Sequence, residues 1–112
     1  MAAIADVQSK GGLAISAITS WEIAQLLERG RLQLNTDAHE WVAAVAAHLD
    51  AEPIPIDFEI AARSIALPGT LHRDPADRIL VATARMHRLT LATRDRALLD
   101  YAGQGHLDAL AL

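Results

Sequence analysis

The sequence contains no cysteine, so the protein can form neither a disulfide framework nor a thiolate metal site. It also lacks a G-x-G-x-x-G phosphate loop. Gly11-Gly12 precedes an apolar segment instead of following one, which argues against an unrelated flavodoxin-like or nucleotide-binding domain. The apolar runs fall far short of the ~20 residues of a membrane helix, and residues 1–12 lack a signal-peptide pattern. We therefore expect a soluble, cytoplasmic protein that does not bind a membrane.

Positive charge is scarce and unevenly distributed. Lys10 is the only lysine, and the net charge of -4 argues mildly against a protein that coats nucleic acid by neutralising phosphates. Six arginines nonetheless share one segment: Arg73, Arg78, Arg85, Arg88, Arg94 and Arg96. Guanidinium groups grip phosphate oxygens, so arginines around an acidic centre suit a phosphodiester held near a metal. The alternative is a solvated face that balances nearby carboxylates.

Length and periodicity predict one α/β domain. A chain of 112 residues with 52% hydrophobic content can build a single core and is too small for two. Strand patterns alternate with helix patterns, which predicts a parallel sheet covered on both faces. The expected strands are 13–18, 53–56, 89–93 and 107–112, and the expected helices are 19–30, 37–49, 58–67, 75–88 and 97–101, after the tail of a helix over residues 1–10.

Two helix starts carry acidic residues. Thr19-Ser20-Trp21-Glu22 has the form of a capping box, and the helix that it opens should turn Trp21, Ala24 and Leu27 inward. In Asp74-Pro75-Ala76-Asp77, Asp74 can cap the next helix and Pro75 suits its first position. The body of that helix is apolar on nearly every side, so we expect it to lie in the interior.

A third acidic residue, Asp95, follows the end of the predicted strand 89–93. Open parallel sheets place their ligands at the carboxyl ends of the strands, so a carboxylate there is a candidate site residue. Each acid also has a purely structural interpretation. Glu22 could complete the capping box, Asp77 could complement the helix dipole, and Asp95 could cap the turn that starts at Arg96.

Three segments resemble successive blocks of the PIN domain, in the VapC toxin branch of toxin–antitoxin ribonucleases. They are Ser16-Ala17-Ile18-Thr19-Ser20-Trp21-Glu22-Ile23, Asp74-Pro75-Ala76-Asp77-Arg78-Ile79-Leu80-Val81-Ala82-Thr83-Ala84 and Leu91-Ala92-Thr93-Arg94-Asp95. The blocks occur in the family's order and span essentially the whole chain. The resemblance implies a three-layer α/β/α fold and an endoribonuclease in which carboxylates hold Mg²⁺ or Mn²⁺ while water attacks an RNA phosphodiester.

The resemblance also implies roles for individual residues. Glu22, Asp77 and Asp95 match the second, third and fourth acidic positions of the family, which makes them the expected catalytic residues and metal ligands. Thr93 matches a polar position beside the metal, and we expect Arg78 and Arg94 to contact the substrate or support the site. Asp74 matches no ligand and is interpreted as the helix cap, and His72 and His87 are assigned no role.

The chain departs from the family pattern at its N-terminus. A PIN domain normally begins with an apolar strand that lies at the centre of the sheet and carries the first catalytic aspartate. Nothing before Leu13 fits, because Asp6 falls in a stretch with a helical pattern. We therefore expect residues 1–112 to form a single, N-terminally truncated PIN-like domain without the central strand, with weakened metal binding.

The family resemblance further implies partners. We expect a cognate antitoxin, whose apolar segment packs in a groove and whose polar group reaches the acidic site, and a homodimer. One alternative function stays open, since the first aspartate is missing: a catalytically inactive PIN-like module that binds an antitoxin or another protein.

Overall fold

The computed structural model describes residues 4–7 and 12–112. Every strand and helix expected from residue 13 onward is present, with bounds that differ by a few residues. The elements in chain order are β1 (Ile4–Val7), β2 (Gly12–Ser16), α1 (Ile18–Glu28), α2 (Ala38–His48), β3 (Glu52–Ile54), α3 (Phe58–Ile65), α4 (Pro75–His87), β4 (Thr90–Thr93), α5 (Arg96–Gly103) and β5 (Ala109–Ala111). None of the helices in the described ranges is long and apolar enough to cross a membrane.

The sheet has the strand order β3-β2-β1-β4-β5, and its centre differs from the prediction. β2 with β3 and β4 with β5 form the expected parallel pairs, but β1 runs antiparallel to both β2 and β4. The predictions of an all-parallel sheet and of an empty central position are therefore wrong. Only residues 8–11 separate β1 from β2, and so short a connection permits an antiparallel neighbour, whereas a parallel one needs a dozen residues or more.

The helical tail predicted over residues 1–10 is also wrong where the structure describes it. Asp6 lies in β1, opposite Leu13 of β2 and Thr90 of β4. The two flanking strands would otherwise each present a row of unpaired backbone groups, so pairing outweighs the local helical pattern. The remainder of the predicted tail, residues 1–3 and 8–10, lies outside the described residues.

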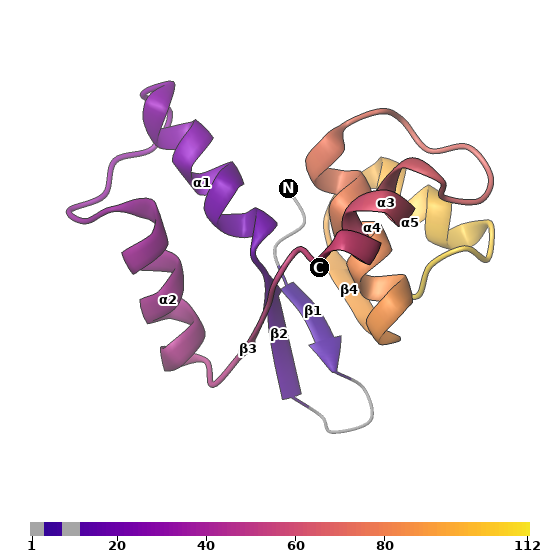
Figure 1. Cartoon of the computed structure of the whole chain (residues 1–112), viewed down its shortest axis with the longest axis horizontal. Helices are drawn as coiled ribbons and strands as arrows, with labels where there is room; N and C mark the ends of the chain where they lie inside the picture. The colour runs from indigo at the N-terminus through magenta and orange to yellow at the C-terminus, as the bar shows by residue number, and fades with distance from the viewer. Residues whose placement is uncertain (1–3, 8–11) are drawn as a thin grey trace.

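Helices cover both faces of the sheet, which confirms the three-layer α/β architecture. Figure 1 shows α1 and α2 on one side of β2 and α3, α4 and α5 on the other. The neighbouring residues Ala14 and Ile15 of β2 belong to separate core clusters, because successive side chains of a strand point to opposite faces. Ala14 packs with the cluster of α4 and β4, and Ile15 packs with that of α1 and α2.

Helix α4 is the most deeply buried of the helices, as its apolar composition predicted. Leu80, Val81 and Ala82 are each at most 2% exposed. At its start, the Asp74 carboxylate accepts a hydrogen bond from the Asp77 backbone N–H at 3.1 Å, which confirms the predicted cap. The helix ends where Arg88 adopts a left-handed conformation with φ of 55°. The cap thus fixes the position of Asp77 at the edge of the core.

Helix α1 begins differently from the prediction. Its N-cap residue is Ala17, which has no side-chain acceptor, and the Ser16 hydroxyl accepts a hydrogen bond from the Ile18 N–H at 3.1 Å instead. The predicted capping box is therefore wrong. The predicted inward face is wrong at Trp21, which is 47% exposed, and at Ala24, which is exposed, whereas Leu27 packs against the core as predicted. Ile23 is buried against α2 instead. Glu22 is thereby left near the start of α4.

Leu91 and Leu110 provide a test of the sheet register. Leu91 of β4 is fully buried, whereas Leu110 of β5 is 57% exposed. We expect Leu91→Ala to lower the free energy of unfolding by about 2–5 kcal/mol, because it leaves a cavity in the core. Leu110→Ala should change it by less than about 0.5 kcal/mol. Urea denaturation measures both, and equal effects would contradict the inward orientation of Leu91.

Candidate metal centre

Two of the predicted acidic residues meet at one edge of the fold. Asp77 lies in the first turn of α4, and Asp95 lies in the turn between β4 and α5. One ligand atom from each of Asp77, Asp95 and His72 lies within 4.8 Å of those of the other two. A carboxylate from a helix start and one from a strand end therefore lie together, at the carboxyl end of a strand where a ligand site was predicted.

The environment of Asp77 disfavours the charged form of its carboxyl group. The residue is 7% exposed, and its Oδ2 lies 3.2 Å from Nε2 of His72. Burial raises the pKa of Asp77, the neighbouring carboxylates of Asp74 and Asp95 raise it further, and His72 opposes them. A pKa raised by burial and neighbouring carboxylates marks a candidate functional group, because a bound cation would relieve both effects.

Glu22 faces the same cluster from α1. Its Oε1 is the one buried side-chain polar atom in the described part of the chain that has no hydrogen-bond partner. Burial, followed by the nearby carboxylates of Asp77 and Asp74, raises the pKa of Glu22 to about 7. Glu22 is not within the 4.8 Å group, so it lies beside that group and is coupled to it electrostatically.

Asp95 also caps a helix, so the structural interpretation of this residue holds as well. Its Oδ1 accepts a hydrogen bond from the Leu98 N–H at 3.2 Å at the start of α5. The Asp95 N–H in turn donates to the Thr93 hydroxyl at 3.0 Å, and Thr93 is fully buried. Thr93 thus orients the turn that carries Asp95.

The guanidinium of Arg78 is hydrogen-bonded within the protein. It donates to four backbone carbonyls: Ser64 at 2.7 Å, Ile65 at 3.2 Å, Leu71 at 2.9 Å and His72 at 3.2 Å. These bonds tie the end of α3 and the loop before α4 to the first turn of α4. Arg78 therefore supports the site from behind, and contact with a substrate stays a prediction for the exposed Arg94.

The other arginines of the segment divide into two groups. Arg85 donates to the His106 carbonyl, and Arg88 ends α4 at the far side from the cluster. Arg73 and Arg96 are exposed and adjoin Asp74 and Asp95 in the chain. Only part of the predicted arginine rim is therefore available to a ligand at this edge.

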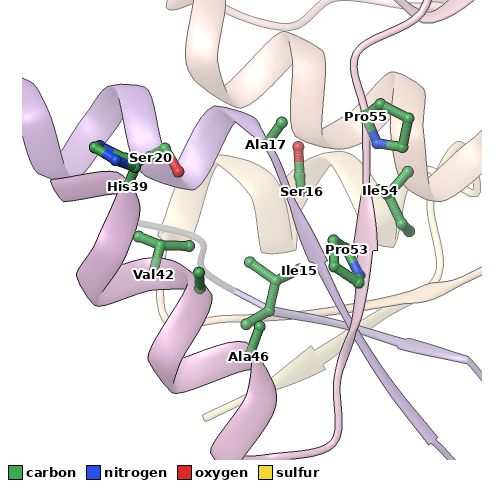
Figure 2. A pocket seen from close by; sticks show the side chains of 11 residues that line it. Ile15, Ser16, Ala17, Ser20, His39, Val42, Ala46, Pro53, Ile54 and Pro55 are labelled. Carbon is green, nitrogen blue, oxygen red and sulfur yellow. The ribbon is translucent and has the colours of Figure 1, made fainter.

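Two hollows lie near α1. A groove of about 420 Å³ runs between α1 and the start of α4, lined by Trp21, Glu22, Gln25, Leu26, Arg29, Asp74, Pro75 and Ala76. A second cavity of about 300 Å³ lies between α2, β2 and β3 and is mostly apolar, with Ile15, Val42, Ala46 and Ile54 in its wall (Figure 2). The groove adjoins the acidic cluster and the cavity is separate from it.

The donor set fits a hard divalent cation. Mg²⁺ and Mn²⁺ prefer carboxylate oxygens, and Mg²⁺ keeps several waters, so a few carboxylates are enough to hold it. A cation would give the unpartnered Glu22 oxygen a partner, and it would stabilise the charged form of Asp77, whose pKa is raised. Asp77 and Asp95 would hold the ion directly, with Glu22 beside it.

Sequence reasoning missed His72. It contacts Asp77 in the structure, although it was assigned no role. Its only signal in the sequence is its place in the short loop two residues before the Asp74 cap. A second group of possible ligands, Asp37, His39 and Glu40, is entirely exposed at the start of α2.

Residues 1–104 match the family model of the PIN domain. The chain belongs to the PIN domain family. It is 38% identical over 98 residues to Ribonuclease VapC22 of Mycobacterium tuberculosis (strain ATCC 25618 / H37Rv), an alignment that covers 88% of this chain and 74% of the relative. No solved structure matches it significantly. The resemblance drawn from the three sequence blocks is thereby confirmed.

The raised pKa of Glu22 predicts how the stability of this PIN domain depends on pH. A carboxyl group that holds its proton more tightly when folded stabilises the fold below pH 4.5, and that contribution is lost as the pH rises toward 7. Without divalent metal, we expect the free energy of unfolding to fall between pH 4.5 and 8. Glu22→Gln should remove on the order of 2 kcal/mol of that fall.

Thermal unfolding in a chelator at several pH values measures this dependence. Glu28→Gln is the matched control, because Glu28 is exposed on the same helix. If the stability of Glu22→Gln depends on pH as that of the wild type does, the pKa of Glu22 is not raised in the folded protein.

Proposed function

We propose that this PIN domain is a metal-dependent endoribonuclease toxin of a toxin–antitoxin pair. The observation that carries the proposal is the acidic cluster of Asp77 and Asp95 with the buried, unpartnered oxygen of Glu22 beside it. The name of the relative, Ribonuclease VapC22, supports RNA as the substrate. We infer that the protein hydrolyses RNA phosphodiester bonds in the cytoplasm.

The residues of the cluster would act together on a phosphodiester. When bound, Mg²⁺ or Mn²⁺ lowers the pKa of a water molecule and offsets the charge that builds on the phosphate. Asp77 and Asp95 would hold the ion, and Glu22 would balance its charge from α1. Thr93 and Arg78 keep the two aspartates in place through the contacts described above.

The groove beside the cluster suits an RNA strand. Arg29 offers a cation for a phosphate, and the exposed ring of Trp21 offers a surface on which a base can stack. Arg94 is exposed next to Asp95 and would contact a phosphate at the other side of the cluster. The net charge of -4 is compatible with this arrangement, because the few cations stand close to the acids.

We propose a cognate antitoxin and a second copy of the chain as further partners. The cavity in Figure 2 is lined mainly by apolar side chains, so it suits an apolar antitoxin segment. The exposed apolar residues Phe58 and Ile65 of α3, 96% and 78% exposed, suit an interface between two copies.

RNA cleavage tests the proposed activity and separates ligands from caps. We expect the wild type to cut a structured RNA pool only with Mg²⁺ or Mn²⁺. Asp95→Asn and Asp77→Asn should each lower the cleavage rate at least about 100-fold, since the ion supplies several kcal/mol of transition-state stabilisation. Asparagine caps a helix as well as aspartate does, so Asp95→Asn keeps α5 capped and removes only the charge.

Asp57→Asn is the matched control, because Asp57 caps α3 in the same way but lies outside the acidic cluster. It should cut RNA at the rate of the wild type. The contradicting result is a folded wild type that cuts no more RNA than the Asp77→Asn variant. In that case the alternative, a catalytically inactive PIN-like binding module, replaces the ribonuclease.

A further inference from the structure

We propose that His72 is a positioning residue of the acidic site, which holds the Asp77 carboxylate through Nε2–H and does not itself bind the metal. The inference rests on the proposed metal centre. His72 lies 3.2 Å from Asp77 Oδ2, a distance that would suit either a hydrogen bond or two ligands of one ion. The second nitrogen of the ring decides between them.

Nδ1 of His72 accepts a hydrogen bond from the Asp74 backbone N–H at 3.2 Å. A backbone N–H can only donate, so the lone pair of the imidazole lies at Nδ1 and the ring proton lies at Nε2. Nε2 therefore faces Asp77 as a donor. A nitrogen that carries a proton has no lone pair for a metal ion, so the directly binding groups of the cluster are the carboxylate oxygens.

The backbone of His72 is fixed as firmly as its ring. Arg78 donates to the carbonyls of Leu71 and His72 through the same nitrogen, Nη1. Residues 74, 77 and 78 all belong to the cap and first turn of α4, so His72 is bound to that turn by its ring on both sides and by its carbonyl. The ring cannot rotate to present Nδ1 to the cluster without losing the Asp74 bond.

The consequence for Asp77 is a fixed carboxylate orientation. One oxygen, Oδ2, accepts from His72, and the other oxygen remains for the cation. Groups that orient a ligand in this way typically change metal affinity 10–100-fold when they are removed. His72 thus contributes to the affinity of the site through Asp77, and it keeps the set of direct ligands entirely oxygen, which suits Mg²⁺.

Nitrogen NMR of the imidazole tests the proton position in the unmodified protein. Two-bond ¹⁵N–¹H correlations distinguish the two tautomers. We expect His72 to carry its proton on Nε2 both in chelator and with saturating Mg²⁺. A spectrum in which Mg²⁺ moves the proton to Nδ1, so that Nε2 becomes a ligand, would overturn the proposal, as would a proton on Nδ1 in the metal-free protein.

Calorimetric titration with Mg²⁺ and with Mn²⁺ alone, without RNA, tests the positioning role. His72→Ala should weaken the binding of either ion about 10–100-fold. His72→Gln should recover most of that loss, because its amide N–H can still donate to Asp77. His87→Ala is the matched control, since His87 is exposed at the other end of α4.

Wild-type affinity in His72→Ala, or equal losses in the Ala and Gln variants, would overturn the positioning role even if RNA is cleaved. Absence of any cation binding by the wild type would overturn the proposed metal centre, while the tautomer of His72 in the metal-free protein would still decide the hydrogen bond. The two failures are therefore distinguishable.

Discussion

The repulsion between carboxylates at one edge of the sheet is the constraint on which the site depends. Asp77 and Asp95 are held close together, and Glu22 faces them with a buried oxygen that no hydrogen bond satisfies. Burial and like charge raise the pKa of both Glu22 and Asp77, so gathering these carboxylates in their charged form is unfavourable by itself. A divalent cation would reverse the sign of that interaction, which is why we propose this geometry as a metal-binding site.

Local structure at the start of α4 keeps this arrangement from relaxing. Asp74 caps the helix and at the same time donates its own N–H to His72, while Arg78 grips the loop that carries His72. The acids therefore cannot move apart without breaking the cap and the loop together. On the other side, Asp95 is fixed because it caps α5 and binds Thr93. The structural roles of these residues are therefore compatible with the functional roles that we propose for them.

Local signals in the sequence predicted much of this arrangement. The caps at Asp74 and Asp95 each depend on a side chain and the next turn of its own helix, and both are confirmed. Several features that depend on distant partners were wrong or missed. Helix α1 begins at Ile18, so Thr19 does not form the predicted capping box. β1 pairs with two strands that lie far from each other in the sequence. The contact of His72 with Asp77 exists only in the folded loop.

The most direct measurement is the number of Mn²⁺ ions that the protein binds at neutral pH, obtained by electron paramagnetic resonance of the free ion. The account predicts one ion per chain for the wild type and for Glu28→Gln, and a clearly weaker site in Asp77→Asn and Glu22→Gln. Equal binding by the wild type and Asp77→Asn would contradict it, because Asp77 would then not contribute to a metal site.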